Sequence, residues 1–173
     1  MQISRIKPNS ERTILSKEGL IRILNRAGVS VPARRMAQVL DLAGEAHRFA
    51  RTGSAQPFPR SVFGRCHVAA IYFCDKADRL DGIKGADILR GVEVPGSGGH
   101  AANLQGLHHL NLLSFNDMLL AVDVTIAQLW QYRHQFKNTA VQVIVSPPSQ
   151  LELRELMIRV YGGGDWFVSP LWF

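Results

Sequence analysis

A cysteine, two adjacent histidines and an aspartate occur in the order that nucleophilic catalysis often uses. Cys66 stands in "GRCHVAA", His108 and His109 open "HHLN", and Asp123 stands in "VDVTIAQ". In such a set a thiolate attacks a carbonyl carbon, an imidazole carries the proton, and a carboxylate orients the imidazole. These residue types therefore predict covalent catalysis at an amide or related acyl group.

A predicted helix over residues 65–80 places Cys66. Cys66 begins its apolar face, which continues through Ala69, Ala70, Phe73, Cys74 and Ala77 at helical spacing. A thiol in the first turn lies at the positive end of the helix dipole, which lowers its pKa. Cys74 lies two turns further along and is predicted to be a structural core residue.

A predicted hairpin brings a histidine to the aspartate. Its two strands lie on either side of Asn116-Asp117, which suits a tight turn. With a two-residue turn, His108 and Asp123 share one face of the sheet, because side chains alternate along a strand. A three-residue loop would favour His109 instead. Even-numbered loops fit the turn residues better, so we predict His108 as the base and His109 as the alternative.

The remaining elements follow from hydrophobic periodicity and from turn residues. We predict helices over 16–27, 32–51 and 149–161, a strand over 140–146 and a short helix or turn over 125–136. Residues 91–107 are predicted to be a glycine-rich loop, and residues 162–173 an aromatic end that docks on the body. Helices followed by strands and one more helix indicate an α+β fold with an antiparallel sheet.

The charge of the chain is unevenly distributed. The net charge is +6, and residues 1–65 hold 12 Lys and Arg against 4 Asp and Glu, a surplus of 8. This basic segment predicts a solvated helical face, with an acidic protein as a possible partner. The arginines lack the interleaved aromatic residues of a single-strand binder, so no specific nucleic-acid partner is expected.

The sequence also bears on compartment and on bound groups. No run of about 18 apolar residues predicts a membrane span, and the N-terminus lacks the apolar stretch of a signal peptide. The two cysteines are predicted to lie about 12 Å apart on one helix, so both thiols should be free. Without Cys-x-x-Cys or His-x₃-His spacing, and without Lys-Ser/Thr after the glycines, we expect no metal, phosphate loop or other cofactor.

The quoted motifs together resemble the papain-like cysteine hydrolase superfamily. The closest likeness is to its bacterial effector and toxin branches and to transglutaminase-like domains, and it covers about residues 60–130. "VDVTIAQ" is similar to the Asp-x-Thr-x-x-Gln ending of such domains. The tryptophan that often follows the histidine is absent, and papain's glutamine before the cysteine has no clear equivalent.

The resemblance implies a papain-like core with a Cys66–His108–Asp123 triad. It implies a thiol hydrolase or acyltransferase acting on a protein or peptide amide, as a protease, glutamine deamidase or amidase. The chain would then comprise a basic helical segment (1–52) packed on a catalytic domain (53–173). As an effector or toxin it would work in the cytoplasm or reach another cell without a signal peptide, and an immunity protein would be a partner. The alternative is a non-catalytic protein-binding module with a basic helical face.

Overall fold

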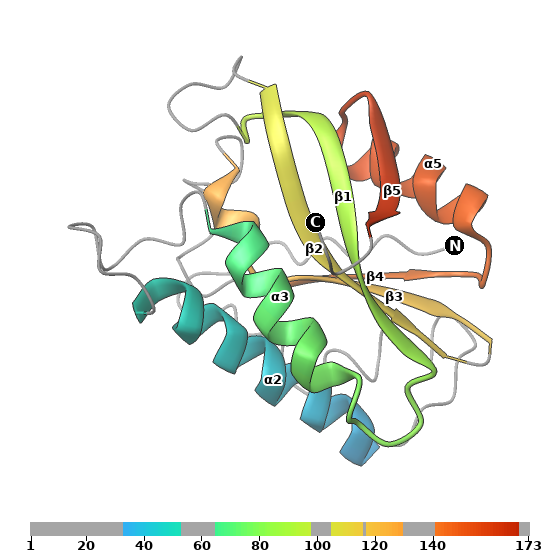
Figure 1. Cartoon of the computed structure of the whole chain (residues 1–173). Coiled ribbons are helices and arrows are strands. Elements are labelled where there is room, and N and C mark those ends of the chain that lie inside the picture. Colours follow the sequence, from blue (N-terminus) through green and yellow to red (C-terminus); the bar gives the residue numbers. More distant parts are fainter. Residues whose placement is uncertain (1–32, 53–64, 98–104, 116, 130–140, 170–173) are drawn as a thin grey trace, which may run out of the picture.

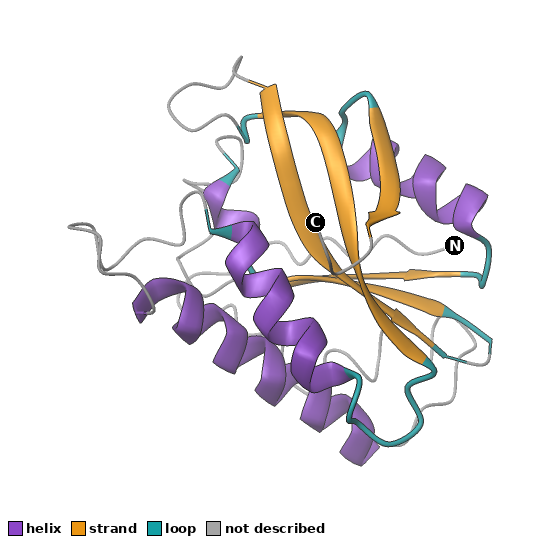
Figure 2. Cartoon of the chain, in the orientation of Figure 1, coloured by secondary structure: helices purple, strands orange, loops and turns teal. Residues whose placement is uncertain are grey.

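The computed structural model describes residues 33–52, 65–97, 105–115, 117–129 and 141–169. In these ranges the chain forms an α+β fold with a five-stranded antiparallel sheet in the order β4-β3-β2-β1-β5 (Figures 1 and 2). The predicted fold class and antiparallel sheet are confirmed. The helix predicted over 16–27 lies outside the described residues.

The helices agree closely with the sequence pattern. They are α2 (Ala33–Thr52), α3 (Cys66–Ala77) and α5 (Gln150–Tyr161), with a short 3-10 helix η1 (Ile126–Gln128). Ser149 caps α5 by accepting a hydrogen bond from the Glu152 N–H. The apolar residues at helical spacing along α2 are buried at Met36, Val39, Ala43 and Ala46, while Leu40 is half-buried.

The strands are β1 (Gly85–Pro95), β2 (Gln105–Ser114), β3 (Leu119–Asp123), β4 (Gln142–Ser146) and β5 (Asp165–Ser169). Phe115 donates its N–H to the Met118 carbonyl at 3.0 Å, which closes the two-residue turn predicted at 116–117. β2 and β3 then pair in the register Ser114↔Leu119 to Asn111↔Val122. The predicted parity of the hairpin is therefore confirmed.

The sequence reading missed β1 and β5. The loop predicted over 91–107 was wrong, because β1 runs through Gly91 to Pro95 and β2 begins at Gln105. Two features hide the strand alternation of β1. Gly91 carries no side chain because Trp166 fills that space, where a Cβ would lie 2.6 Å from the ring. A register shift between Gly91 and Val94 follows, with Glu93 at φ 53°.

The sheet separates two apolar layers. On one face α3 packs on β1 and β2, and α2 packs on α3 (Figure 1). On the other face α5 packs on residues of the opposite strand parity, including Leu89, Leu110 and Ile144. The start of α3 is thereby held against the strand that carries both histidines.

Candidate active site

Cys66 is the first residue of α3 and is 6% exposed. The predicted apolar face is buried at each position, from Cys66 through Ala77. The small side chains of Ala69 and Ala70 are fully packed, so the helix backbone lies close to the sheet. Arg65, at the N-cap, makes no capping hydrogen bond with its side chain, which leaves the positive end of the helix at the thiol.

His108 and Asp123 form a buried pair on the α5 face of the sheet. His108 Nε2 lies 2.8 Å from Asp123 Oδ2, and the two side chains are 0% and 1% exposed. Asp123 also accepts hydrogen bonds from the Tyr161 hydroxyl at 3.1 Å and from the Thr125 N–H at 2.8 Å. The contact that hairpin parity predicted is confirmed, and its catalytic role stays a prediction.

His109 reaches Cys66 from the α3 face. Its Nδ1 lies 3.6 Å from Cys66 Sγ, and its ring lies 4.9 Å from the His67 ring. His108 interacts electrostatically with Cys66 and lowers the pKa of its thiol. We predicted one histidine, His108 or else His109, with one ring nitrogen within about 4 Å of the sulfur and the other facing Asp123. The 3.6 Å contact with the sulfur belongs to His109, whereas the contact with Asp123 belongs to His108. Among the described residues, the two neighbouring histidines thus divide these contacts, with His109 on the cysteine and His108 on Asp123.

The electrostatics favour a charged Cys66–His108 pair. Burial raises the pKa of the Cys66 thiol, but hydrogen bonds to His108 and His109 and the His108 charge outweigh it and bring the pKa to about 5. Burial lowers the pKa of His108, but Asp123 outweighs it and brings the pKa to about 10. Between these values the thiolate and the imidazolium coexist, which is the resting form of an activated cysteine.

Cys74 has the opposite environment. It is fully buried, and Asn111 Nδ2 donates to its sulfur at 3.1 Å and to the Ala70 carbonyl at 2.8 Å. Burial raises the pKa of the Cys74 thiol to about 12. The predicted structural role of Cys74 agrees with its burial. The hydrogen bonds of Asn111 link β2 to the middle of α3.

Gln128 is a member of the site that sequence reasoning did not assign. It is 4% exposed, its Nε2 lies 2.6 Å from His108 Nδ1, and it contributes to the lowered pKa of Cys66. Its Nε2 donates to Nδ1 while that nitrogen is unprotonated. When Nδ1 carries a proton, the suitable partner is Oε1, which is buried and has no hydrogen-bond partner among the described residues. The sequence signal for this role was that Gln128 is the last residue of "VDVTIAQ". The 3-10 helix η1 ends at Gln128 and places it against His108.

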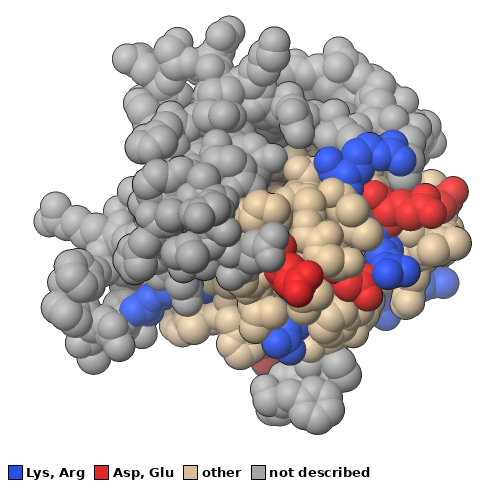
Figure 3. Space-filling model, turned by 90° about the horizontal axis from the view of Figure 1, so that it is seen from above, with Lys and Arg blue, Asp and Glu red and all other residues tan. Residues whose placement is uncertain are grey.

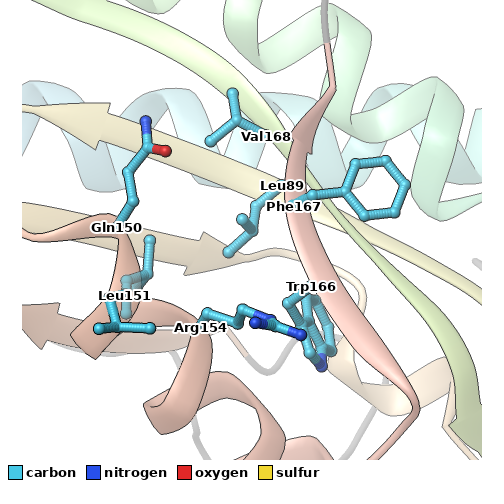
Figure 4. A pocket seen from close by; sticks show the side chains of 8 residues that line it. Leu89, Gln150, Leu151, Arg154, Trp166, Phe167 and Val168 are labelled. Carbon is cyan, nitrogen blue, oxygen red and sulfur yellow. The ribbon is translucent and has the colours of Figure 1, made fainter.

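A groove on the other side of the sheet is separate from Cys66. It has a volume of about 280 Å³ and lies between the start of α5 and β5, where Leu151, Arg154 and Trp166 line it (Figure 4). Arg154 is already paired with Asp165. The groove therefore offers an apolar surface without a free charge on Arg154.

Within the described ranges, no three His, Cys, Asp or Glu side chains gather as a metal site requires. None of the described helices is both long and apolar enough to cross a bilayer. In the view from above, acidic and basic side chains are interspersed on the described surface (Figure 3). The exposed side of α2 likewise carries Asp41 and Glu45 beside Arg34 and Arg48. The described surface in this view thus has no face of a single charge.

No family model, curated protein or solved structure matches the chain.

Proposed function

We propose that this chain is a papain-like thiol hydrolase or acyltransferase that acts on a protein or peptide amide. The observation that carries the proposal is the set of contacts at the start of α3: His109 Nδ1 lies 3.6 Å from Cys66 Sγ, and His108 Nε2 lies 2.8 Å from Asp123 Oδ2. His108 also lowers the pKa of the Cys66 thiol. This arrangement joins a nucleophile, a proton carrier and a group that orients it. It supports a catalytic role over the alternative of a binding module, which has no need of a buried thiolate.

Acylation uses the charged pair directly. The Cys66 thiolate attacks the amide carbonyl carbon, and the carbonyl electrons move to the oxygen. The tetrahedral intermediate then expels the amine, which takes the proton from His108 Nδ1 as the C–N bond breaks. Asp123 keeps Nε2 protonated and stabilises the imidazolium. The products are a thioester on Cys66 and a free amine.

The acceptor in the second step decides the outcome. Neutral His108 removes a proton from water or from an amine as it attacks the thioester, and the C–S bond breaks to restore the Cys66 thiolate. Water gives peptide cleavage when the amide is in the main chain and deamidation when it is a glutamine side chain. An amine gives transamidation. All three outcomes use the same acyl-enzyme.

Gln128 and the first turn of α3 are the proposed oxyanion donors. Gln128 lies against His108 and lowers the pKa of the Cys66 thiol, and the backbone N–H of Cys66 lies at a helix start without a side-chain cap. A carbonyl oxygen that gains charge beside the sulfur needs donors at this place. Because these donors are fixed before the reaction, they stabilise the transition state without reorganisation.

Gln128→Ala is expected to lower kcat about 10²-fold with a KM within a few-fold of wild type, since the lost interaction strengthens only in the transition state. Steady-state kinetics on an amide substrate measures both constants. Gln128→Glu is the matched variant, because it keeps the side-chain length but removes both N–H donors and adds negative charge. It should be slower still. A kcat for Gln128→Ala within about threefold of wild type would contradict the assignment.

A mixed pool of peptides and proteins tests the proposal. Mass spectrometry would follow new chain ends, conversion of glutamine to glutamate, and incorporation of an added amine. Wild type and Cys74→Ala should carry out at least one of these reactions, and Cys66→Ala should carry out none. If wild type is indistinguishable from Cys66→Ala in all three assays, the amide-hydrolase proposal fails and the binding module replaces it.

A further inference from the structure

A row of side chains crosses the sheet beside Cys66 on the α3 face. In the strand register Arg90 of β1 lies opposite His109 of β2 on one side and opposite Phe167 of β5 on the other. Directly opposed residues of antiparallel strands have Cβ atoms about 5 Å apart. His109 in turn contacts the sulfur at 3.6 Å. The His109 side chain therefore lies between Arg90 and the proposed nucleophile Cys66.

The charge of Arg90 is uncompensated among the described residues. No carboxylate in those ranges lies within 4.0 Å of its guanidinium, whereas Arg79 pairs with Asp75 and Arg154 with Asp165. Its Nε is buried and has no hydrogen-bond partner there. A buried donor without a partner is costly, and it becomes favourable when a ligand supplies an acceptor.

The position of Arg90 is held by an aromatic ring. Its guanidinium carbon lies 5.9 Å from the centre of the Phe167 ring, and Phe167 also lines the groove beside α5 (Figure 4). A guanidinium over an aromatic face keeps its edge N–H groups free to bind a planar anion in a two-point contact. Apolar side chains on this side of the sheet and on α3 are also exposed: Ile71, Leu107 and Phe167 at 39%, 44% and 42%.

We propose that Arg90 binds a carboxylate of the substrate next to the reactive amide, which makes it a specificity-determining residue. The inference rests on the proposed function, because it takes Cys66 as the point of attack. The substrate class is an amide flanked by an acidic side chain or by a chain-terminal carboxylate. Phe167, which lies opposite Arg90, covers the neighbouring part of that chain.

Alkylation of Cys66 by two maleimides tests this without a known substrate. N-ethylmaleimide is neutral and 3-maleimidopropionate is similar in size but anionic, so the ratio of their rates at Cys66 reports attraction of a carboxylate. Arg90→Gln is expected to lower the anionic-to-neutral ratio about tenfold. Arg90→Lys keeps the positive charge but lacks the planar guanidinium that makes a two-point contact, so it should retain part of the preference for the anionic maleimide. Arg79→Gln is the matched control, since it removes the same charge at the far end of α3.

The outcomes separate the two proposals. A ratio that Arg90→Gln leaves unchanged, or that Arg79→Gln lowers equally, overturns the anion site. Cys66 that reacts with N-ethylmaleimide no faster than Cys74 overturns the proposed function instead. If Arg90→Gln does not fold, the wild-type ratio decides: it should fall toward unity at high salt, and a salt-independent ratio overturns the site.

Peptidyl maleimides distinguish the two sources of a carboxylate. One carries an internal glutamate with an amidated end, and the other ends in glycine with a free carboxylate. The source that Arg90 recognises is the one whose rate falls about tenfold in Arg90→Gln. If Arg90→Gln leaves the rates of both probes unchanged from wild type, the proposal is overturned.

Discussion

His108→Ala is expected to lower amide turnover by about 10³-fold or more. The variant removes the imidazolium that protonates the leaving amine and stabilises the thiolate. Burial raises the pKa of the Cys66 thiol, and His108 is one of the groups that lower it. Without His108 the pKa of the thiol therefore rises from about 5 toward its ordinary value. Turnover on an amide substrate, together with the iodoacetamide rate at Cys66 near pH 6, measures both effects.

His109→Ala is the matched control for His108→Ala, since both residues lower the pKa of Cys66 but, among the described residues, the contact with Asp123 belongs to His108. We expect His109→Ala to cost about tenfold in turnover. The reverse order, with His109→Ala inactive and His108→Ala active, would transfer the role of base to His109 and leave the thiol mechanism in place.

Asp123→Asn is expected to lower amide turnover about 10⁴-fold while the protein stays folded. The amide of an asparagine donates to His108 Nε2, so the neutral ring places its proton on Nδ1, where it can no longer accept one from the thiol. The loss of the carboxylate also lowers the pKa of His108, because the attraction of Asp123 no longer offsets the effect of burial. Turnover and thermal unfolding, measured on the same preparation, separate catalysis from stability.

Tyr161→Phe is the control for that substitution. It removes one hydrogen bond of 3.1 Å to Asp123 and keeps the carboxylate, so turnover should fall only about tenfold. The chosen variant is asparagine because Asp123→Ala would also leave Thr125 N–H and the Tyr161 hydroxyl without an acceptor. If Asp123→Asn unfolds the protein, or retains wild-type turnover, Asp123 is a structural residue.

Local periodicity was sufficient to predict the elements that carry the site. The +3/+4 spacing from Cys66 predicted the buried face of α3, and Asn116-Asp117 predicted the turn that pairs His108 with Asp123. Both predictions depend on contacts along a short stretch of chain or across a single turn. Such contacts follow from the periodicity of side chains and from the residues at turns, and both can be recognised in a single sequence.

Long-range packing was not predictable in the same way. β1 was missed because the side chain that fills its space at Gly91 belongs to Trp166, about 75 residues later in the chain. Gln128 was missed because its contact with His108 depends on how η1 turns after β3. The approach of His109 to Cys66 required the position of α3 across β2, which no periodicity specifies.

The pH dependence of Cys66 alkylation tests the central claim most directly. Brief labelling with iodoacetamide from about pH 4 to pH 9, with each cysteine peptide quantified by mass spectrometry, gives one profile for each thiol. Because the pKa of Cys66 is lowered to about 5 and that of Cys74 is raised to about 12, Cys66 should label above pH 5 with a rate that stays high to neutral pH. Cys74 should label little throughout. A Cys66 rate that rises only near pH 9, or that Cys74 equals at neutral pH, would contradict an activated nucleophile.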